Sequence, residues 1–243
     1  MEFKFDSFKK RANDPALSKW EKIGFPDSYR KDREFDIFLD IDNKLNLSAG
    51  GLKVLDLGCG CSDLVNILVA HSVENNNFLD LVDSAEMLDN IERDIIKNDH
   101  RIKLIPGRFP EELSSFIENG IEKYDSIIVY SVIQYVFLES SIFSFIHHCL
   151  RLLKPGGKLL IGDIPNNSVR NRFLNSSEGV KFAKNAETST VIIQHDDFER
   201  IDDSIVISIL LRFRAFNCET YLLPQNLSLP FSNRREDILI IKR

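Results

Sequence analysis

The chain contains 243 residues with a formal net charge of −6, and 43% of its residues are hydrophobic. This length and composition fit one globular domain with a full core, or such a domain with a cap. The negative charge argues against a nucleic-acid partner, whose phosphates need a basic surface. The longest uncharged run, residues 126–138, is shorter than the about 20 residues that cross a bilayer, which argues against a membrane partner.

The N-terminal residues and the cysteines indicate the compartment. The first residues, MEFKFDSFKKR, are charged and lack the apolar stretch of about 7–15 residues found in a secretory signal. Cys59 and Cys61 lie in a glycine turn, and Cys149 and Cys218 lie in apolar segments, so no disulfide framework is visible. We therefore expect a cytoplasmic protein.

Residues 1–50 carry scattered apolar side chains in a charged background. They predict a helical cover or cap ahead of a main domain that comprises residues 51–243. Apolar residues recur at helix-like spacing around Phe38, which predicts a helix over roughly 30–46.

The stretch VLDLGCGCSD, residues 54–63, organises the chain that follows it. A short apolar run, two glycines and the start of a helical pattern are typical of the opening of a nucleotide-binding α/β unit. Gly58 and Gly60 allow positive φ and let a ligand approach the backbone closely. We therefore expect a ligand site at this turn.

Five apolar runs alternate with helical patterns after residue 50. This alternation predicts an α/β fold with a parallel sheet that is covered on both faces, and ligands in such sheets bind at the carboxyl ends of the strands. The expected strands are 53–58, 78–83, 102–105, 124–131 and 158–163, and the expected helices are 61–72, 84–98, 111–118 and 139–153.

Residues 164–198 interrupt this alternation. They are rich in Asn and Ser, and such a long connection in a compact domain is typical of a lid or of disorder. A helix is expected over 204–213. The last two apolar runs, 218–223 and 237–242, are joined by a segment with two prolines and no helical pattern, which predicts an antiparallel hairpin.

Four motifs in order give the chain a family resemblance. They are VLDLGCG, LVDSAEML, YDSIIVYSVIQYV and LLKPGGKLLIGD. Together they resemble the class I S-adenosylmethionine-dependent methyltransferases over about residues 50–243. The resemblance implies a seven-stranded Rossmann-like sheet, mostly parallel with its last strand antiparallel and flanked by helices. It also implies S-adenosylmethionine as the methyl donor, S-adenosylhomocysteine as the product, and no metal.

One residue of the glycine turn distinguishes this donor from a dinucleotide. A GxGxxG fingerprint starting at Gly58 would place glycine at position 63, where the chain has Asp63. A carboxylate at the helix start would repel a pyrophosphate. S-adenosylmethionine has no phosphate, so the turn favours it over NAD.

The resemblance also implies the residues that contact the cofactor. Asp83 would accept hydrogen bonds from both ribose hydroxyls, as two carboxylate oxygens can face two donors. Where the family often has an acid that bonds the adenine amino group, this chain has Arg108, so Phe109 stacking is expected to hold the adenine. The positions expected to line the cofactor are Asp56, Gly58, Cys59, Gly60, Asp83, Ser84, Met87, Arg108, Phe109 and Ser131.

The expected reaction is methyl transfer to a small-molecule acceptor, which we predict to be O-methylation of an anionic or sugar-type metabolite. Tyr135 would face the acceptor. If a general base is needed, His195 is the first candidate and Asp163 the second. Side chains that could bind the acceptor are Tyr29, Arg170 and Arg172.

Other readings of these residues stay open. His195 could be a loop histidine, Arg170 and Arg172 could be solvated charges, and Asp56 could bond the turn's own N–H groups. Cys59 and Cys61 do not predict a metal site, since no second ligand pair follows at zinc spacing. A protein acceptor, an NAD-dependent oxidoreductase and a non-catalytic S-adenosylmethionine-binding scaffold remain the alternatives, and the oligomeric state is open.

Overall fold

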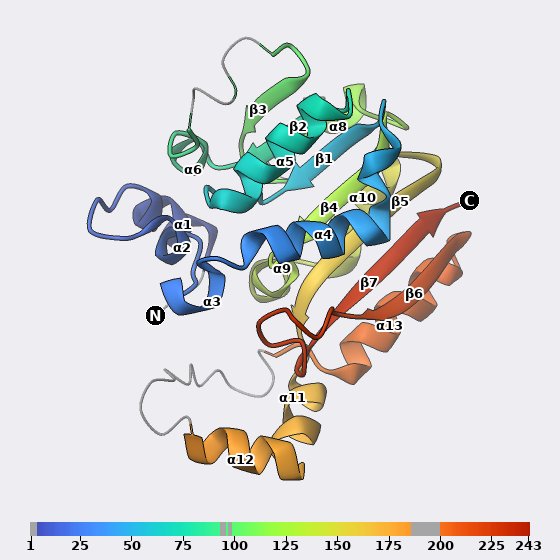
Figure 1. Ribbon diagram of the computed structural model, residues 1–243. Coiled ribbons are helices and arrows are strands. Elements are labelled where there is room, and N and C mark those ends of the chain that lie inside the picture. The colour runs from blue at the N-terminus through green and yellow to red at the C-terminus, as the bar shows by residue number, and fades with distance from the viewer. Residues whose placement is uncertain (1–3, 93–95, 97–98, 186–199) are drawn as a thin grey trace.

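The computed structural model describes residues 4–92, 96, 99–185 and 200–243. Its centre is a seven-stranded sheet in the order β3-β2-β1-β4-β5-β7-β6 (Figure 1). β7 is antiparallel to both of its neighbours, and the other pairs are parallel, which confirms the predicted sheet and its closing hairpin. The strands are β1 (Lys53–Leu57), β2 (Phe78–Asp83), β3 (Ile102–Pro106), β4 (Tyr124–Tyr130), β5 (Leu153–Pro165), β6 (Cys218–Pro224) and β7 (Arg235–Lys242).

The central strands form because they can bury both faces. Leu55, Ile127 and Leu159 are fully buried on β1, β4 and β5. A parallel strand covered on both sides needs such a continuous apolar run. The parallel pairing brings the carboxyl ends of β1, β2 and β4 to one edge of the sheet, and the residues that follow them meet there.

Two helical layers cover the sheet. One core cluster is formed with α8, α10 and α13, and the other with α4, α5 and α6. The N-terminal helices α1–α3 lie near the sheet edge at which β1, β2 and β4 end (Figure 1). The helices of these layers are α1 (Phe5–Ala12), α2 (Lys19–Lys22), α3 (Asp27–Arg30), α4 (Glu34–Leu45), α5 (Asp63–Glu74), α6 (Ala85–Leu88), α8 (Ser114–Asn119), α10 (Ile142–Leu152) and α13 (Asp203–Arg214).

The helix predicted over roughly 30–46 is α4, which begins at Glu34 rather than at residue 30. α3 ends at Arg30, and Asp32 has a φ of 61° before α4 begins at Glu34. A left-handed residue cannot continue a right-handed helix. The break puts Arg30 at the end of α3 and Glu34 at the start of α4, and both side chains are buried.

Other helices also differ from the prediction. The helix expected over 84–98 begins as α6, which ends at Leu88, and residues 93–95 and 97–98 of that range lie outside the described residues. The helix expected over 139–153 is α10, and it is preceded by α9 (Ile133–Glu139), which the sequence did not predict. Ser141 separates them, because its side chain accepts the N–H of Ser144 and caps α10.

The connection predicted as an irregular insertion contains two helices. They are α11 (Asn167–Leu174) and α12 (Ser177–Asn185). Asn166 starts α11 by accepting the N–H groups of Ser168 at 2.8 Å and Val169 at 3.3 Å. A composition rich in Asn and Ser therefore supplied a helix cap rather than a loop. The rest of the insertion, residues 186–199, lies outside the described residues.

Candidate active site

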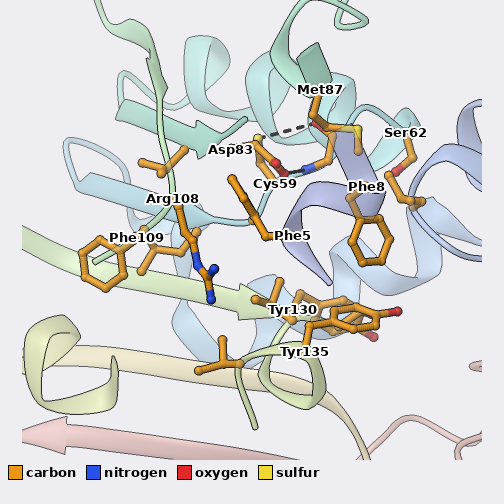
Figure 2. Close-up of a pocket in the computed structure, with 18 of the residues that line it drawn as sticks. Phe5, Phe8, Cys59, Ser62, Asp83, Met87, Arg108, Phe109, Tyr130 and Tyr135 are labelled. Carbon is orange, nitrogen blue, oxygen red and sulfur yellow. Dashed lines mark hydrogen bonds between the residues drawn. The ribbon is translucent and has the colours of Figure 1, made fainter. Parts of the chain in front are cut away.

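A pocket opens at the carboxyl ends of β1, β2 and β4, beneath the N-terminal helices. Its empty volume is about 1030 Å³, which includes space that is open to solvent. Figure 2 shows Asp83 and Met87 on one side and Tyr130 and Tyr135 on the other. Expected site residues that line it are Gly58, Cys59, Gly60, Asp83, Met87, Arg108, Phe109, Ser131 and Tyr135.

The glycine turn is shaped by close packing. Gly58 and Gly60 have φ values of 75° and 68°, a region that side chains disfavour. A Cβ on Gly58 would lie 2.6 Å from Cγ2 of Val132, and one on Gly60 would lie 2.7 Å from Cγ2 of Ile23. Both glycines are therefore required by the backbone and by their neighbours, as the sequence predicted.

Asp83 ends β2 with its carboxylate in the pocket. One oxygen accepts the N–H of Gly60 at 2.9 Å (Figure 2). The other accepts the N–H of Ser84 at 2.7 Å. Burial raises the pKa of Asp83 to about 6, and these two hydrogen bonds oppose the rise. Since each carboxylate oxygen has a second lone pair, the group can still accept two hydroxyls.

Two expected cofactor residues support the pocket without lining it. Asp56 is 3% exposed in the wall below the turn, where burial and the charge of Asp83 raise its pKa to about 8. Ser84 is the N-cap of α6 and accepts the N–H of Met87 at 3.2 Å. It positions Met87, which does line the pocket.

Arg108 connects α1 to the opposite rim of the pocket. Its guanidinium lies 3.5 Å from the carboxylates of Glu111 and Glu139 and over the ring of Phe5. The N–H of Phe5 donates to Glu139 at 3.0 Å. Arg108, which stands where the family often has an acid, therefore helps to hold α1 in place. Glu139 also places a carboxylate in the pocket lining, which the sequence did not reveal.

Aromatic side chains form the roof and the far wall. Phe8 meets Tyr135 edge to face, with ring centroids 4.8 Å apart, and Phe109 meets Phe145 in the same way at 5.3 Å. Burial raises the pKa of the Tyr135 hydroxyl. The site therefore has an apolar interior in which few polar groups set the orientation of a ligand.

A buried polar chain joins the cover to the ends of β4 and β5. Arg30 donates to the Ser131 hydroxyl at 2.6 Å, and this hydroxyl donates to the carboxylate of Asp163. Ser131 and Asp163 have φ values of 59° and 58°. Such backbone strain costs roughly 1–3 kcal/mol per residue and is concentrated at functional sites.

The sequence assigned Arg30 only to the cover. It is 5% exposed and lines the pocket, and its guanidinium lies 4.4 Å from the centroid of the Phe25 ring. No local pattern distinguishes it from the other cations of residues 1–50. Its position follows from a contact across the fold, which a single sequence cannot show.

Tyr29 and Asp163 lie in a second, smaller pocket. This pocket shares Phe25, Arg30 and Tyr130 with the first, so the two lie next to each other. The ring of Tyr29 packs on Phe231, with centroids 4.4 Å apart. The two residues are thus neighbours of the main pocket and not part of its lining.

None of the remaining candidates is described as lining either pocket. Arg172 forms an exposed ion pair with Asp203 at the start of α13, and neither it nor Arg170 lines the two pockets. His195 lies outside the described residues.

The described part of the chain has neither a cluster of metal-ligating side chains nor a membrane-spanning helix. No group of three or more His, Cys, Asp or Glu side chains is placed to hold a metal ion. None of the described helices combines the length and the apolar character that a membrane span requires.

Residues 55–159 match the family model of a methyltransferase domain. No curated protein sequence matches the chain significantly. Among solved structures, the plantazolicin methyltransferase BpumL in complex with SAH is 14% identical, with 98% of each chain covered and a TM-score of 0.56.

Two further structures have the same fold. The CurJ carbon methyltransferase is 14% identical, with 97% of this chain and 65% of that chain covered and a TM-score of 0.56. An O-methyltransferase family protein from Burkholderia thailandensis is 17% identical, with 87% and 56% covered and a TM-score of 0.54. The predicted fold class is confirmed.

Proposed function

We propose that the chain is a class I S-adenosylmethionine-dependent methyltransferase, since residues 55–159 match a methyltransferase domain and the whole chain has the fold of such enzymes. Its main pocket would bind S-adenosylmethionine, and it would methylate an oxygen atom of a small-molecule acceptor. The observation that carries the proposal is Asp83, whose carboxylate faces the pocket beside the glycine turn. The donor supplies an electrophilic methyl group on a sulfonium, so the protein needs only to align the acceptor and exclude water.

The residues present fit this donor. Asp83 would accept the two ribose hydroxyls, and Met87 and Phe109 would pack on the adenine. The guanidinium of Arg30 would bind the carboxylate of the methionine part. Asp63 at the helix start is ion-paired with Lys19 and offers nothing to a pyrophosphate, which supports S-adenosylmethionine over NAD.

The polar chain at Ser131 gives a route for the acceptor's proton. The Ser131 hydroxyl accepts from Arg30, donates to Asp163 and keeps one lone pair. An acceptor hydroxyl would pass its proton to Ser131, which would pass its own to Asp163. Tyr135 would position the acceptor, and His195 remains a second candidate for the base.

The proposal includes a role for residues 1–50 and a cytoplasmic location. Residues 1–50 would close the pocket over the bound donor, because Phe5, Phe8 and Phe25 already form its roof. The four cysteines are free and buried, which supports the reducing environment of the cytoplasm.

Titration calorimetry with S-adenosylhomocysteine tests the donor site. Asp83→Ala is expected to weaken its binding by about 1.5–3 kcal/mol, the scale of hydrogen bonds to a charged group. Asp125→Asn is the matched control, because Asp125 lies at the opposite end of the sheet, paired with Lys154. Unchanged affinity in Asp83→Ala, or tight binding of NAD alone, would contradict the proposal.

A further inference from the structure

Arg234 and Arg235 lie at the start of β7, on the far side of β4 and β5 from the expected donor residues. Asp83 and Met87 follow β2, and Ser131 follows β4. Continuing in the same direction, the sheet order is β4-β5-β7. β7 is antiparallel, so Arg235 pairs with Pro165 at the carboxyl end of β5. The arginines are therefore at the ligand-binding edge, on the side away from the adenine.

Arg234 is held among aromatic rings and has no counter-ion among the described residues. Its guanidinium carbon lies 4.3 Å from the centroid of the Phe231 ring, and it also faces Phe173 of α11 and Phe182 of α12. Its Nε is buried and has no hydrogen-bond partner, and no ion pair joins it to any described acid. Figure 1 shows α11 and α12 beside the start of β7.

The neighbouring charges add to this positive site. Burial lowers the pKa of Arg234, Tyr29 opposes this shift, and the charges of Arg235 and Arg170 add to it. Arg235 donates to the backbone oxygen of Asp163 at 2.9 Å and lies 3.4 Å from its carboxylate. Arg30 is 3.9 Å from the same carboxylate, so one acid is shared between two guanidinium groups.

Packing alone does not account for this arrangement. The rings attract a cation but do not neutralise it. A leucine or methionine would fill the same space between three phenylalanines without the cost of burying a charge. An arginine that is repelled by two others is stabilised when an anion binds to it.

We propose that the methyl acceptor carries an oxyanion, a carboxylate or a phosphate, that binds to Arg234 and Arg170. This inference rests on the proposed function, which places the reacting oxygen near Ser131. β7 is two strands from β4, so the anion would lie roughly 10 Å from the reacting oxygen, given a strand spacing of about 4.8 Å. Phe231 and Tyr29 would contact the part of the acceptor between the two ends.

The test is titration calorimetry of the full chain with inorganic phosphate and, separately, with acetate, at constant ionic strength set by sodium chloride. We expect saturable binding at one site, and the tighter of the two probes identifies the kind of oxyanion. Arg234→Gln should weaken binding at least tenfold and Arg170→Gln about threefold, whereas Arg234→Lys should retain most of it.

Arg212→Gln is the matched control. Arg212 also stacks on a phenylalanine, Phe143, at 4.3 Å, but it lies on α13 with no arginine described against it, so its loss should leave phosphate binding unchanged. Absence of saturable binding of both probes, or equal affinity in Arg234→Gln and the wild type, would overturn the inference.

S-adenosylhomocysteine binding separates this inference from the proposed function. Each variant is expected to bind S-adenosylhomocysteine as the wild type does, which also shows that it is folded. If the wild type binds S-adenosylhomocysteine but neither anion, only the oxyanion site is wrong. If the wild type does not bind S-adenosylhomocysteine, the proposed function itself fails, whatever the anions do.

Discussion

The two halves of the candidate site are built over different distances along the chain. In the donor half, Asp83 bonds Gly60, which is 23 residues away, and both belong to one strand–helix–strand unit. In the half at the carboxyl ends of β4 and β5, Arg30 bonds Ser131 across 101 residues, and Asp163 meets Arg235 across 72. The first half depends on local backbone geometry, and the second depends on packing the cover and the last strands onto the sheet.

The largest expected effect is a loss of stability in the donor half, at the glycine turn. Gly58→Ala adds a Cβ at positive φ, 2.6 Å from Val132, so backbone strain and overpacking should together lower the free energy of unfolding by roughly 2–5 kcal/mol. Urea denaturation measures this loss. Gly51→Ala is the control, because Gly51 also has positive φ but nothing lies near its Cβ. A similar loss in both variants would show that strain alone matters.

A second substitution removes the long-range contacts that Arg30 makes. Arg30→Met leaves the buried carboxylates of Asp163 and Glu34 without this cation, and the free energy of unfolding should fall by about 3 kcal/mol at pH 8. The loss should be smaller at pH 5, because burial raises the pKa of Glu34 and the carboxyl group freed from Arg30 can then protonate. Arg33→Met, which removes an exposed charge nearby, should change stability by less than about 0.5 kcal/mol. A loss that does not depend on pH would argue for packing rather than charge.

The same difference explains how far the sequence could predict the molecule. The strands, the glycine turn and Asp83 carry local signals, namely apolar runs, φ requirements and an acid at a strand end. Arg30 and Arg234 carry none, because their surroundings come from remote segments. The helix that begins after Asn166 was missed because Asn is typical of loops, and only the structure shows that its side chain caps a helix.

The ionisation of Asp83 predicts how ligand binding in the donor half depends on pH. Its pKa is raised to about 6 in the folded protein, above the unfolded value near 3.9. Folding therefore favours the protonated form, and stability contributed by this group falls as the pH rises from about 4 to 6. Ligand binding has the opposite trend, because only the carboxylate accepts two ribose hydroxyls. S-adenosylhomocysteine affinity should fall about tenfold from pH 7 to pH 5.

Calorimetry at several pH values measures this fall, and Asp83→Asn is the control. The amide does not titrate, so its weaker affinity should stay level over the same range. If the wild type and Asp83→Asn lost affinity in parallel as the pH fell, the titrating group would be a different residue.

The smallest effect concerns the contact between the cover and the donor half. Arg108 is partly exposed and lies 3.5 Å from Glu139, so Arg108→Gln should remove about 0.5–1 kcal/mol. Because this contact holds α1 over the pocket, the loss should appear as two- to fivefold weaker S-adenosylhomocysteine binding. A double-mutant cycle with Glu139→Gln isolates the pair, and additive effects would show that the two residues act separately. Coupling between them would mean that the Arg108–Glu139 ion pair, both of whose members contact Phe5, holds α1 over the pocket.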